Sequence, residues 1–405
     1  MCCWSARLNN SAEIFLVFLR LGLTSFGGPV AHLGYFREEF VRRRAWLDEH
    51  AYADLVALCQ FLPGPASSQV GAGIGLLRGG LPGALAAFLG FTLPSAILLV
   101  LFALGVSHAG AQLDSGWLHG LKVVAVAVVA QALWGMGRTL TPDLPRAALA
   151  IAAALVATLL PSASGQIGAI VLGGAIGWTC LRATPALPAP SLPVRISRRA
   201  GACLLALFLL LLAGLPMLAA GSDSYAVRLF AGFYRAGALV FGGGHVILPL
   251  LQSQVVPAGW VSNDAFLAGY GAAQAVPGPL STFAAYLGAI STQSPSGWTG
   301  AAIALGAIFL PALLLVMGAL PFWDSVRRHT GVRHALLGVN AAVVGLLLAA
   351  FYHPVWTSAI LDGGDVVLAL AAFLLLVAGK WPPWLVVALT ALTAGWLQPA
   401  LSSSL

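Results

Sequence analysis

Residues 60–67 read Gln-Phe-Leu-Pro-Gly-Pro-Ala-Ser, and residues 274–281 read Gln-Ala-Val-Pro-Gly-Pro-Leu-Ser, 214 positions later. Two prolines around a glycine end one helix and begin another. The flanking apolar runs, 51–62 and 66–77, would each form a helix of about 18 Å, too short for a bilayer core of roughly 30 Å. A proline kink in one ordinary spanning helix is the simpler alternative. Two copies at matching places favour helices that break at mid-depth and turn back.

The composition is that of an integral membrane protein. Hydrophobic residues make up 59% of the 405 residues and charged residues only 8%, whereas about 25% charged is usual in a soluble domain. Apolar runs recur along nearly the whole length, which leaves no room for a sizeable soluble domain. The net charge of +7 comes largely from arginines between apolar runs, which is typical of cytoplasmic loops and not of nucleic-acid binding. We expect no cleavable signal sequence.

The two halves of the chain repeat each other beyond this motif. The pattern Phe-x-Arg-x-Gly at 18–22 returns at 233–237, and Phe-Gly-Gly at 26–28 returns at 241–243. The offset between the copies drifts only from 214 to 218, so few insertions separate them. Internal duplication of this kind in a membrane protein is typical of transporters.

A proline-rich stretch with several arginines separates the halves and marks the boundary between them (Arg182, Arg195, Arg198 and Arg199). We therefore expect three parts. They are an N-terminal transmembrane repeat at 1–181, a cytoplasmic linker with a connecting transmembrane helix at 182–224, and a C-terminal transmembrane repeat at 225–405.

Basic residues lie in non-equivalent loops of the two repeats. Loop 37–44 of the first repeat is arginine-rich, while its loop 105–119 has no Lys or Arg; in the second repeat, loop 252–263 has none and loop 324–334 is basic. The arginines concerned are Arg37, Arg42, Arg43, Arg44, Arg327, Arg328 and Arg333. Because positive loops stay in the cytoplasm, equivalent loops lie on opposite faces, and the repeats are predicted to be inverted.

Placing every basic loop on one face also requires that the segments with the glycine and Pro-Gly-Pro breaks re-enter the membrane instead of crossing it. The predicted fold is an all-α polytopic membrane protein with two inverted-topology repeats and broken re-entrant helices. It has about nine crossings and four hairpins, thirteen hydrophobic segments in all, as read from the sequence. The N-terminus is predicted inside and the C-terminus outside.

Three cations are predicted at membrane depth, Arg20, Lys122 and Arg235. A cation at the bilayer centre costs about 2.5–3.5 kcal/mol on insertion scales, so each is a candidate for function. The alternative is that the side chains extend to the headgroups. Arg20 and Arg235 stand at equivalent places one turn before a glycine break, which favours a role. Lys122 has Asn340 as its counterpart, which favours the headgroup alternative.

The broken helices supply a second feature that favours anion binding, namely helix N-termini within the membrane. A helix that begins at Pro65 or Pro279 directs free backbone N–H groups and the positive end of its dipole toward mid-membrane. Hydroxyl side chains follow in the first turn, where they could cap the helix or donate to a ligand. The predicted substrate-binding residues are Arg20, Gly27, Gly28, Gln60, Pro63, Gly64, Pro65, Ser67, Ser68, Arg235, Gly242, Gly243, His245, Gln274, Pro277, Gly278, Pro279, Ser281 and Thr282.

Motifs for other chemistry are lacking. No Walker sequence, HExxH, paired carboxylate or cysteine cluster occurs, so no catalytic residue, metal or cofactor is expected. A few side chains could carry protons (Glu13, His32, Asp54, His245 and Asp264). The two histidines flank the glycine breaks, although a lone histidine near a helix end is more often structural.

These motifs resemble those of the chromate ion transporter family in its long two-domain form. The resemblance rests on Ser-Phe-Gly-Gly-Pro-Val-Ala-His at 25–32, Phe-Gly-Gly-Gly-His at 241–245 and both Pro-Gly-Pro motifs, and it covers essentially the whole chain. It implies a bacterial inner-membrane protein that exports chromate, driven by the electrochemical gradient, and confers chromate resistance. Sulfate is a related oxyanion. The halves differ at Pro29 and Gly244, which leaves open whether both contribute equally.

We therefore expect a secondary transporter, not an enzyme, that exports chromate or a similar tetrahedral oxyanion. Its partners are the oxyanion and the lipid bilayer, with no nucleic acid and with a homodimer left open; the C-terminus would be periplasmic. A sulfate or organic-anion carrier on the same scaffold is the alternative within transport. An anion channel and a membrane enzyme acting on a lipid phosphate are the others, and the enzyme would need a nucleophile that the sequence does not offer.

Overall fold

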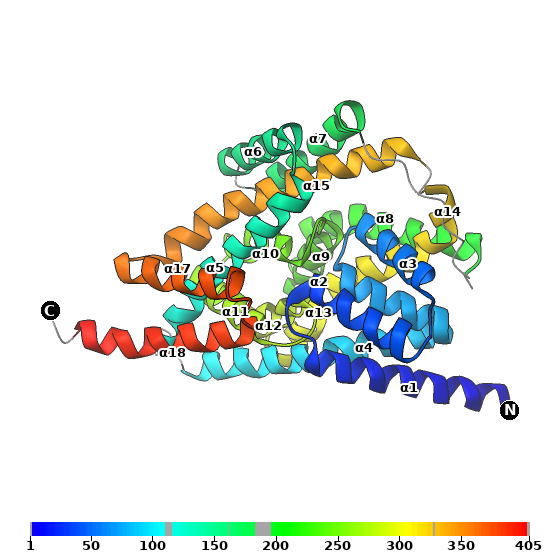
Figure 1. Ribbon diagram of the computed structural model, residues 1–405, viewed down its shortest axis with the longest axis horizontal. Coiled ribbons are helices and arrows are strands. Elements are labelled where there is room, and N and C mark those ends of the chain that lie inside the picture. The colour runs from blue at the N-terminus through cyan, green and yellow to red at the C-terminus, as the bar shows by residue number, and fades with distance from the viewer. Residues whose placement is uncertain (1, 110–115, 161, 183–195, 327–328, 403–405) are drawn as a thin grey trace.

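The computed structural model describes residues 2–109, 116–160, 162–182, 196–326 and 329–402 (Figure 1). Those residues form helices, turns and irregular segments, and no strand is found among them. Three arginines used above to orient the chain, Arg195, Arg327 and Arg328, lie outside the described residues.

The first half contains α1 (Cys2–Thr24), α2 (Gly28–Arg37), the π-helical η1 (Glu38–Arg43), α3 (Glu49–Phe61), α4 (Ala66–Ala109), α5 (Gly116–Leu140), α6 (Leu144–Leu159) and α7 (Ala163–Cys180). The rest of the chain contains α8 (Arg198–Ala220), α9 (Tyr225–Ala238), the 3-10 turn η3 (Gly244–Val246), α10 (Ile247–Val255), α11 (Asn263–Ala275), the 3-10 turn η4 (Leu280–Thr282), α12 (Phe283–Ile290), α13 (Gly297–Ala319), η5 (Leu320–Phe322), α14 (Trp323–Val326), α15 (Thr330–Ala350), η6 (Phe351–Trp356), α16 (Thr357–Ala359), α17 (Gly363–Val377) and α18 (Pro383–Ser402).

The first Pro-Gly-Pro motif separates α3 from α4, as the sequence predicts. α3 begins after Asp48, whose side chain accepts a hydrogen bond from the amide of Ala51, and it ends before the first proline. α4 is itself divided at Gly80, which has φ 67° and ψ −157°. The backbone of Gly75 touches that of Gly83 across this turn. In one continuous helix these glycines would lie about 12 Å apart, so the chain folds back on itself.

The second Pro-Gly-Pro motif is built in the same way. α11 begins after Ser262, whose hydroxyl accepts from the amide of Ala265, and it ends at Ala275. After the motif, η4 and α12 lead into a turn, and α12 folds back on α13 with the backbones of Gly288 and Gly300 in contact. Both motifs therefore form helical hairpins of matching construction.

The long helices of each repeat pack with the terminal helices of the other. α5 packs against α17 and α18, whereas α15 packs against α6 and α7 (Figure 1). Small residues allow these close approaches: Gly120 meets the backbone of Thr390 and Ala391, and Gly338 meets that of Gly173. We call α5, α17 and α18 the α5 arm, and α15, α6 and α7 the α15 arm. The remaining packed helices, α1–α4 and α8–α13, form the hairpin core.

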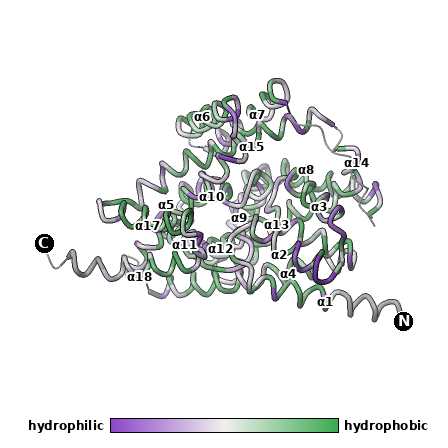
Figure 2. The backbone as a smooth tube through the Cα atoms, in the orientation of Figure 1, coloured by the Kyte–Doolittle hydropathy of each residue, from purple (hydrophilic) through white to green (hydrophobic). Residues whose placement is uncertain are grey.

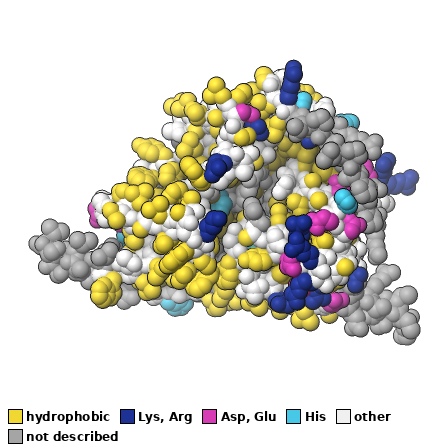
Figure 3. All heavy atoms as spheres, in the orientation of Figure 1, with side chains coloured by type: hydrophobic (Ala, Val, Ile, Leu, Met, Phe, Trp, Pro, Cys, Tyr) yellow, Lys and Arg dark blue, Asp and Glu magenta, His cyan; other side chains and the backbone are white. Residues whose placement is uncertain are grey.

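Much of the surface is apolar, as the hydropathy colouring of Figure 2 shows. α8 exposes four leucines, Leu207, Leu209, Leu210 and Leu218, with Leu210 at 67% and Leu209 at 60%. Exposed apolar helices of this kind are stable in lipid and not in water. In Figure 3, yellow apolar side chains cover much of the side of α17 and α18, and charged ones gather near α1 and α3.

Within the described part of the chain, five helices are long and apolar enough to cross a bilayer: Ala66–His108, Gly116–Leu140, Arg198–Ala220, Gly297–Val326 and Thr330–Ala359. The chain is thus an all-α polytopic membrane protein. The predicted number of nine crossings and the inversion of the repeats stay predictions, since they concern placement in a membrane.

Candidate functional site

A cavity of about 660 Å³ lies between the hairpin core and the α5 arm. Residues within five segments line it: 27–29, 128–139, 242–245, 273–280 and 376–383. The first and third segments are the glycine breaks of the two repeats, and the fourth is the second Pro-Gly-Pro tip. Residues far apart in sequence, and from both repeats, therefore meet around one space.

The glycine breaks bring bare backbone to the cavity. Gly27, Gly28, Gly242 and Gly243 have φ angles of 100°, 77°, 72° and 145°, a region that other L-residues rarely adopt. Their lack of side chains leaves the backbone accessible to a ligand.

Each Pro-Gly-Pro tip is hydrogen-bonded to the glycine break of the other repeat. The amide of Gly64 donates to the carbonyl of Val240 at 2.7 Å, and the amide of Gly278 donates to the carbonyl of Ser25 at 2.9 Å. Ser25 and Val240 immediately precede Phe-Gly-Gly and its copy, so the two bonds are equivalent within the duplication. They tie the repeats together directly at the site.

The second tip faces the cavity. Gln274, Gly278 and His245 are among the predicted site residues that line it. His245 is positioned by the hydroxyl of Tyr270, which lies 2.8 Å from its Nδ1. Further along the tip, the hydroxyl of Thr282 donates to the carbonyl of Pro279 at 2.7 Å. This bond is local but is not a helix cap, because the hydroxyl of Thr282 donates to a carbonyl and accepts from no helix amide.

The first tip does not line this cavity. Gln69 fills the space beside it: its Nε2 donates to the carbonyl of Pro63 at 2.8 Å and lies against Gly64. Ser67 and Ser68 are buried. The sequence predicted both tips at one site, whereas the cavity is asymmetric. The predicted residues that do not line it are Arg20, Gln60, Pro63, Gly64, Pro65, Ser67, Ser68, Arg235, Pro277, Pro279, Ser281 and Thr282.

Two hydroxyls are buried without a hydrogen-bond partner among the described residues, those of Ser68 and Ser281. They belong to the first turn after each Pro-Gly-Pro motif. Their donor capacity is therefore not used within the described chain.

The two arginines predicted at membrane depth lie away from the cavity lining. Arg20 is exposed on α1. Arg235, on α9, is half-buried and donates from Nη2 to Oε1 of Gln254 at 2.6 Å. Their neighbours differ, since Arg20 lies near the carboxylate of Glu39 and favours its charged form, whereas Arg235 has the neutral Gln254 as its partner.

Four polar residues of the α5 arm line the cavity although the sequence did not select them: Gln131, Arg138, Thr139 and Lys380. Arg138 and Lys380 are exposed, and the guanidinium of Arg138 lies 5.9 Å from the ring of Trp134. No carboxylate is among the described lining residues. Sequence reasoning passed over these two cations because both stand at the ends of apolar runs, where basic residues are common.

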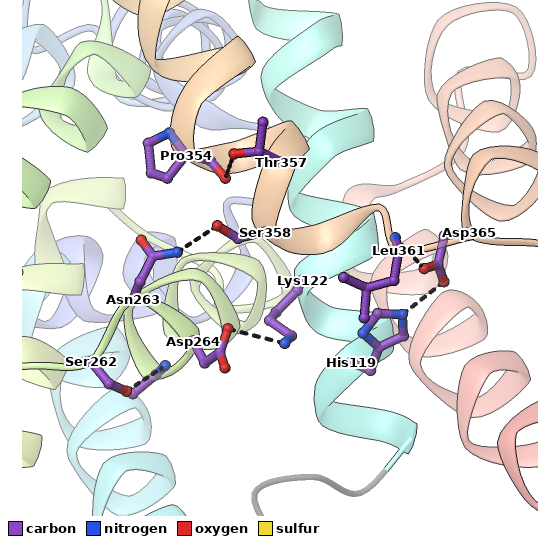
Figure 4. A network of polar contacts seen from close by, with 11 residues as sticks. His119, Lys122, Ser262, Asn263, Asp264, Pro354, Thr357, Ser358, Leu361 and Asp365 are labelled. Carbon is purple, nitrogen blue, oxygen red and sulfur yellow. Dashed lines mark hydrogen bonds and ion pairs between the residues drawn. The ribbon is translucent and has the colours of Figure 1, made fainter. Parts of the chain in front are cut away.

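A polar network joins the other end of the α5 arm to α11 (Figure 4). Nζ of Lys122 lies 3.1 Å from Oδ1 of Asp264, so Lys122 has an ion pair and not only a headgroup as partner. Nδ2 of Asn263 donates to Oγ of Ser358 at 2.8 Å. Within the arm, Nε2 of His119 lies 2.7 Å from Oδ1 of Asp365.

The other proposed proton carriers have structural partners as well. Glu13 accepts from Arg44 at 2.9 Å, and Asp54 accepts from the indole of Trp323 at 2.9 Å. His32 is buried, with Nε2 3.2 Å from the carbonyl of Ser25. In the described residues, no group of three or more His, Cys, Asp or Glu side chains could hold a metal ion.

Comparison with known proteins places the chain among transporters. The family model described as chromate transporter matches residues 12–178 and 227–396, one stretch in each half. A chromate transport protein of Pseudomonas aeruginosa is 29% identical over 83% of this chain and 79% of its own. One of Cupriavidus metallidurans is 26% identical over 84% and 81%. An uncharacterized transporter of Methanocaldococcus jannaschii is 27% identical over 85% and 84%. No solved structure matches the chain.

Proposed function

The chain belongs to the chromate transporter family, and from this premise we propose that it is a secondary transporter of the bacterial inner membrane. It exports chromate, or a similar tetrahedral oxyanion, and the electrochemical gradient drives this export. In a bacterium it would confer chromate resistance. The names of relatives in Pseudomonas aeruginosa and Cupriavidus metallidurans support chromate as the substrate.

One observation carries the proposal: the cavity between the two repeats combines cations and bare backbone with no carboxylate among its described lining residues. Arg138 and Lys380 supply positive charge, and the glycine breaks allow an anion to approach backbone N–H groups. A cavity of about 660 Å³ is also large enough for a hydrated oxyanion, since ligand pockets usually span about 300–1,000 Å³.

The predicted topology supplies the direction. Arg138 and Lys380 lie next to the loops after α5 and α17, which the inverted-repeat arrangement places in the cytoplasm. An exported ion would enter a cavity that opens to that side. The three-part organisation at 1–181, 182–224 and 225–405, with inverted repeats and re-entrant hairpins, is part of this proposal. The matched hairpins and the exchanged packing of the two arms support it.

We propose that the ion contacts the glycine breaks, Gln274, His245 and the second tip in this conformation. The first tip, with Ser67 and Ser68, would contact the ion after the arms move. The reason is that the duplication makes the first tip the counterpart of the second. Arg20 and Arg235 stay predicted site residues. Both lie outside the cavity lining. We therefore propose that they act on the ion indirectly, through the glycine breaks that follow them in the sequence.

The test is oxyanion flux in inside-out vesicles that contain the protein. We expect chromate uptake into these vesicles that rises with an imposed electrochemical gradient and that sulfate inhibits. Uptake of sulfate or an organic anion in preference to chromate would establish the alternative substrate. Flux that follows the anion gradient alone, with no effect of a proton gradient, would establish a channel. No oxyanion flux under any gradient, from protein shown to be folded, would refute the proposal.

We also propose that the chain is not an enzyme. A membrane enzyme acting on a lipid phosphate needs a nucleophile or an acid–base pair beside its cations. The described lining of the cavity offers Thr139 and His245 but neither a carboxylate nor a cysteine.

A further inference from the structure

Arg138 and Lys380 have no carboxylate partner among the described residues, unlike Arg146 and the arginines of α2 and η1. Arg146, one loop away, pairs with Asp143 at 2.6 Å, and the arginines near α2 pair with glutamates. The guanidinium of Arg138 lies beside the ring of Trp134. Both cations belong to the α5 arm and both line the cavity, so their charge is available to a ligand there.

The backbone of Lys380 gives independent support. Its φ angle is 52°, in the left-handed region where only glycine is unstrained and other residues cost about 1–2 kcal/mol. Glycine would be the unstrained choice for this turn between α17 and α18. What lysine adds is a charged side chain at the cavity.

We propose that Arg138 and Lys380 form the anion-recruiting and anion-selecting site of the cavity, and that they favour dianions over monoanions. This inference rests on the proposed function. Two cations without carboxylate partners attract a dianion twice as strongly as a monoanion at the same distance. They raise its local concentration at the mouth of the cavity, and salt screens this effect.

The experiment is equilibrium binding of chromate, sulfate and nitrate to purified protein, with Arg138→Gln, Lys380→Gly and the double variant. Lys380→Gly removes the charge and also relieves backbone strain, so we expect its melting temperature to be no lower than that of the wild type. The double variant should bind chromate at least about tenfold more weakly at low salt. Its affinity should no longer fall steeply with salt. Arg146→Gln is the matched control, since Asp143 already holds that cation, and its affinity should stay unchanged.

Two outcomes separate this inference from the proposed function. Wild-type affinity and salt dependence in the double variant would overturn the inference and leave transport standing. A wild-type protein that binds no oxyanion at all would overturn the proposed function as well.

A second inference comes from how the two arms pack against the hairpin elements of each repeat. The α5 arm packs against α11, and α15 packs against α10 and η3, all hairpin elements of the second repeat. The equivalent pairs in the first repeat, α15 with α3 and α5 with α2, show no comparable packing in the described chain. The arms therefore pack more closely on α10 and α11 of the second repeat than on α2 and α3 of the first.

The polar network of Figure 4 lies where the α5 arm packs against α11. Two of its contacts cross from the α5 arm and its neighbour α16 to the hairpin core: Lys122 to Asp264, and Ser358 to Asn263. Lys122 is 16 residues before Arg138 on α5, which places it about 24 Å away along the helix axis. The network and the cationic mouth of the cavity are thus at opposite ends of the same helix.

We infer that these two contacts form a gate that must open for the ion to leave on the face opposite the cavity mouth. Under the predicted topology this face is periplasmic. The inference also rests on the proposed function, because a gate has a role only in a transporter. The third contact, His119 to Asp365, joins α5 to α17 within the arm and moves with it as a unit.

The test is crosslinking in a chain whose own cysteines are replaced. Asn263→Cys with Ser358→Cys places one thiol on each side of the gate, and His119→Cys with Asp365→Cys is the matched pair within the arm. A short bifunctional thiol reagent should abolish chromate flux in the first pair and leave it in the second. Chromate binding from the cavity side should survive in both.

Flux before the reagent is added shows that each variant is folded. If the first pair has no initial flux, Lys122→Cys with Asp264→Cys replaces it, with the same expected block. Continued flux after complete crosslinking across the gate would overturn the inference. Loss of flux in the control pair alone would also overturn it, because movement within the arm would then be the essential step.

Discussion

Replacing Gly278 with alanine is expected to abolish oxyanion transport, and replacing Gly64 with alanine is expected to do the same. Their φ angles are 101° and 126°, which cost a residue with a Cβ about 1–2 kcal/mol. A Cβ on Gly278 would lie 2.8 Å from Oγ of Ser95, and one on Gly64 would lie 2.8 Å from Cβ of Ala312. Overpacking of this kind typically costs a further 1–3 kcal/mol, by order of magnitude.

The damage would fall on the bonds between the repeats. The amides of these glycines donate to Ser25 and Val240, so a tip pushed out of place releases the glycine break of the other repeat. Gly306→Ala is the control, because nothing lies within 4 Å of its Cβ position on α13. We expect wild-type flux from the control and less than a few per cent from the tip variants at equal expression. Wild-type flux from Gly64→Ala alone would mean that the first tip has no part in transport.

The breaks in the helices were predictable because they depend only on residues at the break itself. Proline and glycine act on their own φ angles and on the preceding turn, so 60–67 and 274–281 specify a hairpin tip without reference to the rest of the fold. The structure confirms both breaks and the early ends of α3 and α11. The fold-back at Gly80 lies in a Gly-Gly pair, and the shortness of the run before it was the usable signal.

The partners of the tips were not predictable from one sequence. Bonds such as Gly64 to Val240 join backbone groups 176 positions apart, and any residue can offer a backbone carbonyl. The symmetric duplication led us to expect symmetric tips around one site. A protein with two equivalent halves nevertheless adopts one conformation at a time, and here only the second tip lines the cavity.

The cations that line the cavity were likewise not predictable from the sequence. Arg20 and Arg235 stood out because they interrupt apolar sequence, and the cost of burying charge made them candidates. Arg138 and Lys380 did not stand out, because basic residues at the ends of apolar runs are expected from topology alone. Their use for a cavity depends on how the α5 arm packs, and that packing is set by contacts between the repeats, such as Gly120 against α18.

The largest effect on folding is expected from Gly338→Val on α15. This glycine touches the carbonyl of Gly173 and the Cα of Gly177 on α7, so a larger side chain would force the two helices apart. Helix pairs in membranes depend on such close packing, since lipid offers no hydrophobic drive to hold them together. Because α15 belongs to the second repeat and α7 to the first, the variant would separate the exchanged arm from its partner. We expect little monodisperse protein in detergent and a melting temperature lower by several degrees.

Gly168→Val, on α7 with nothing within 4 Å of its Cβ position, should behave as the wild type. A stable Gly338→Val protein would contradict the exchanged packing on which the pseudo-symmetric arrangement of the arms depends.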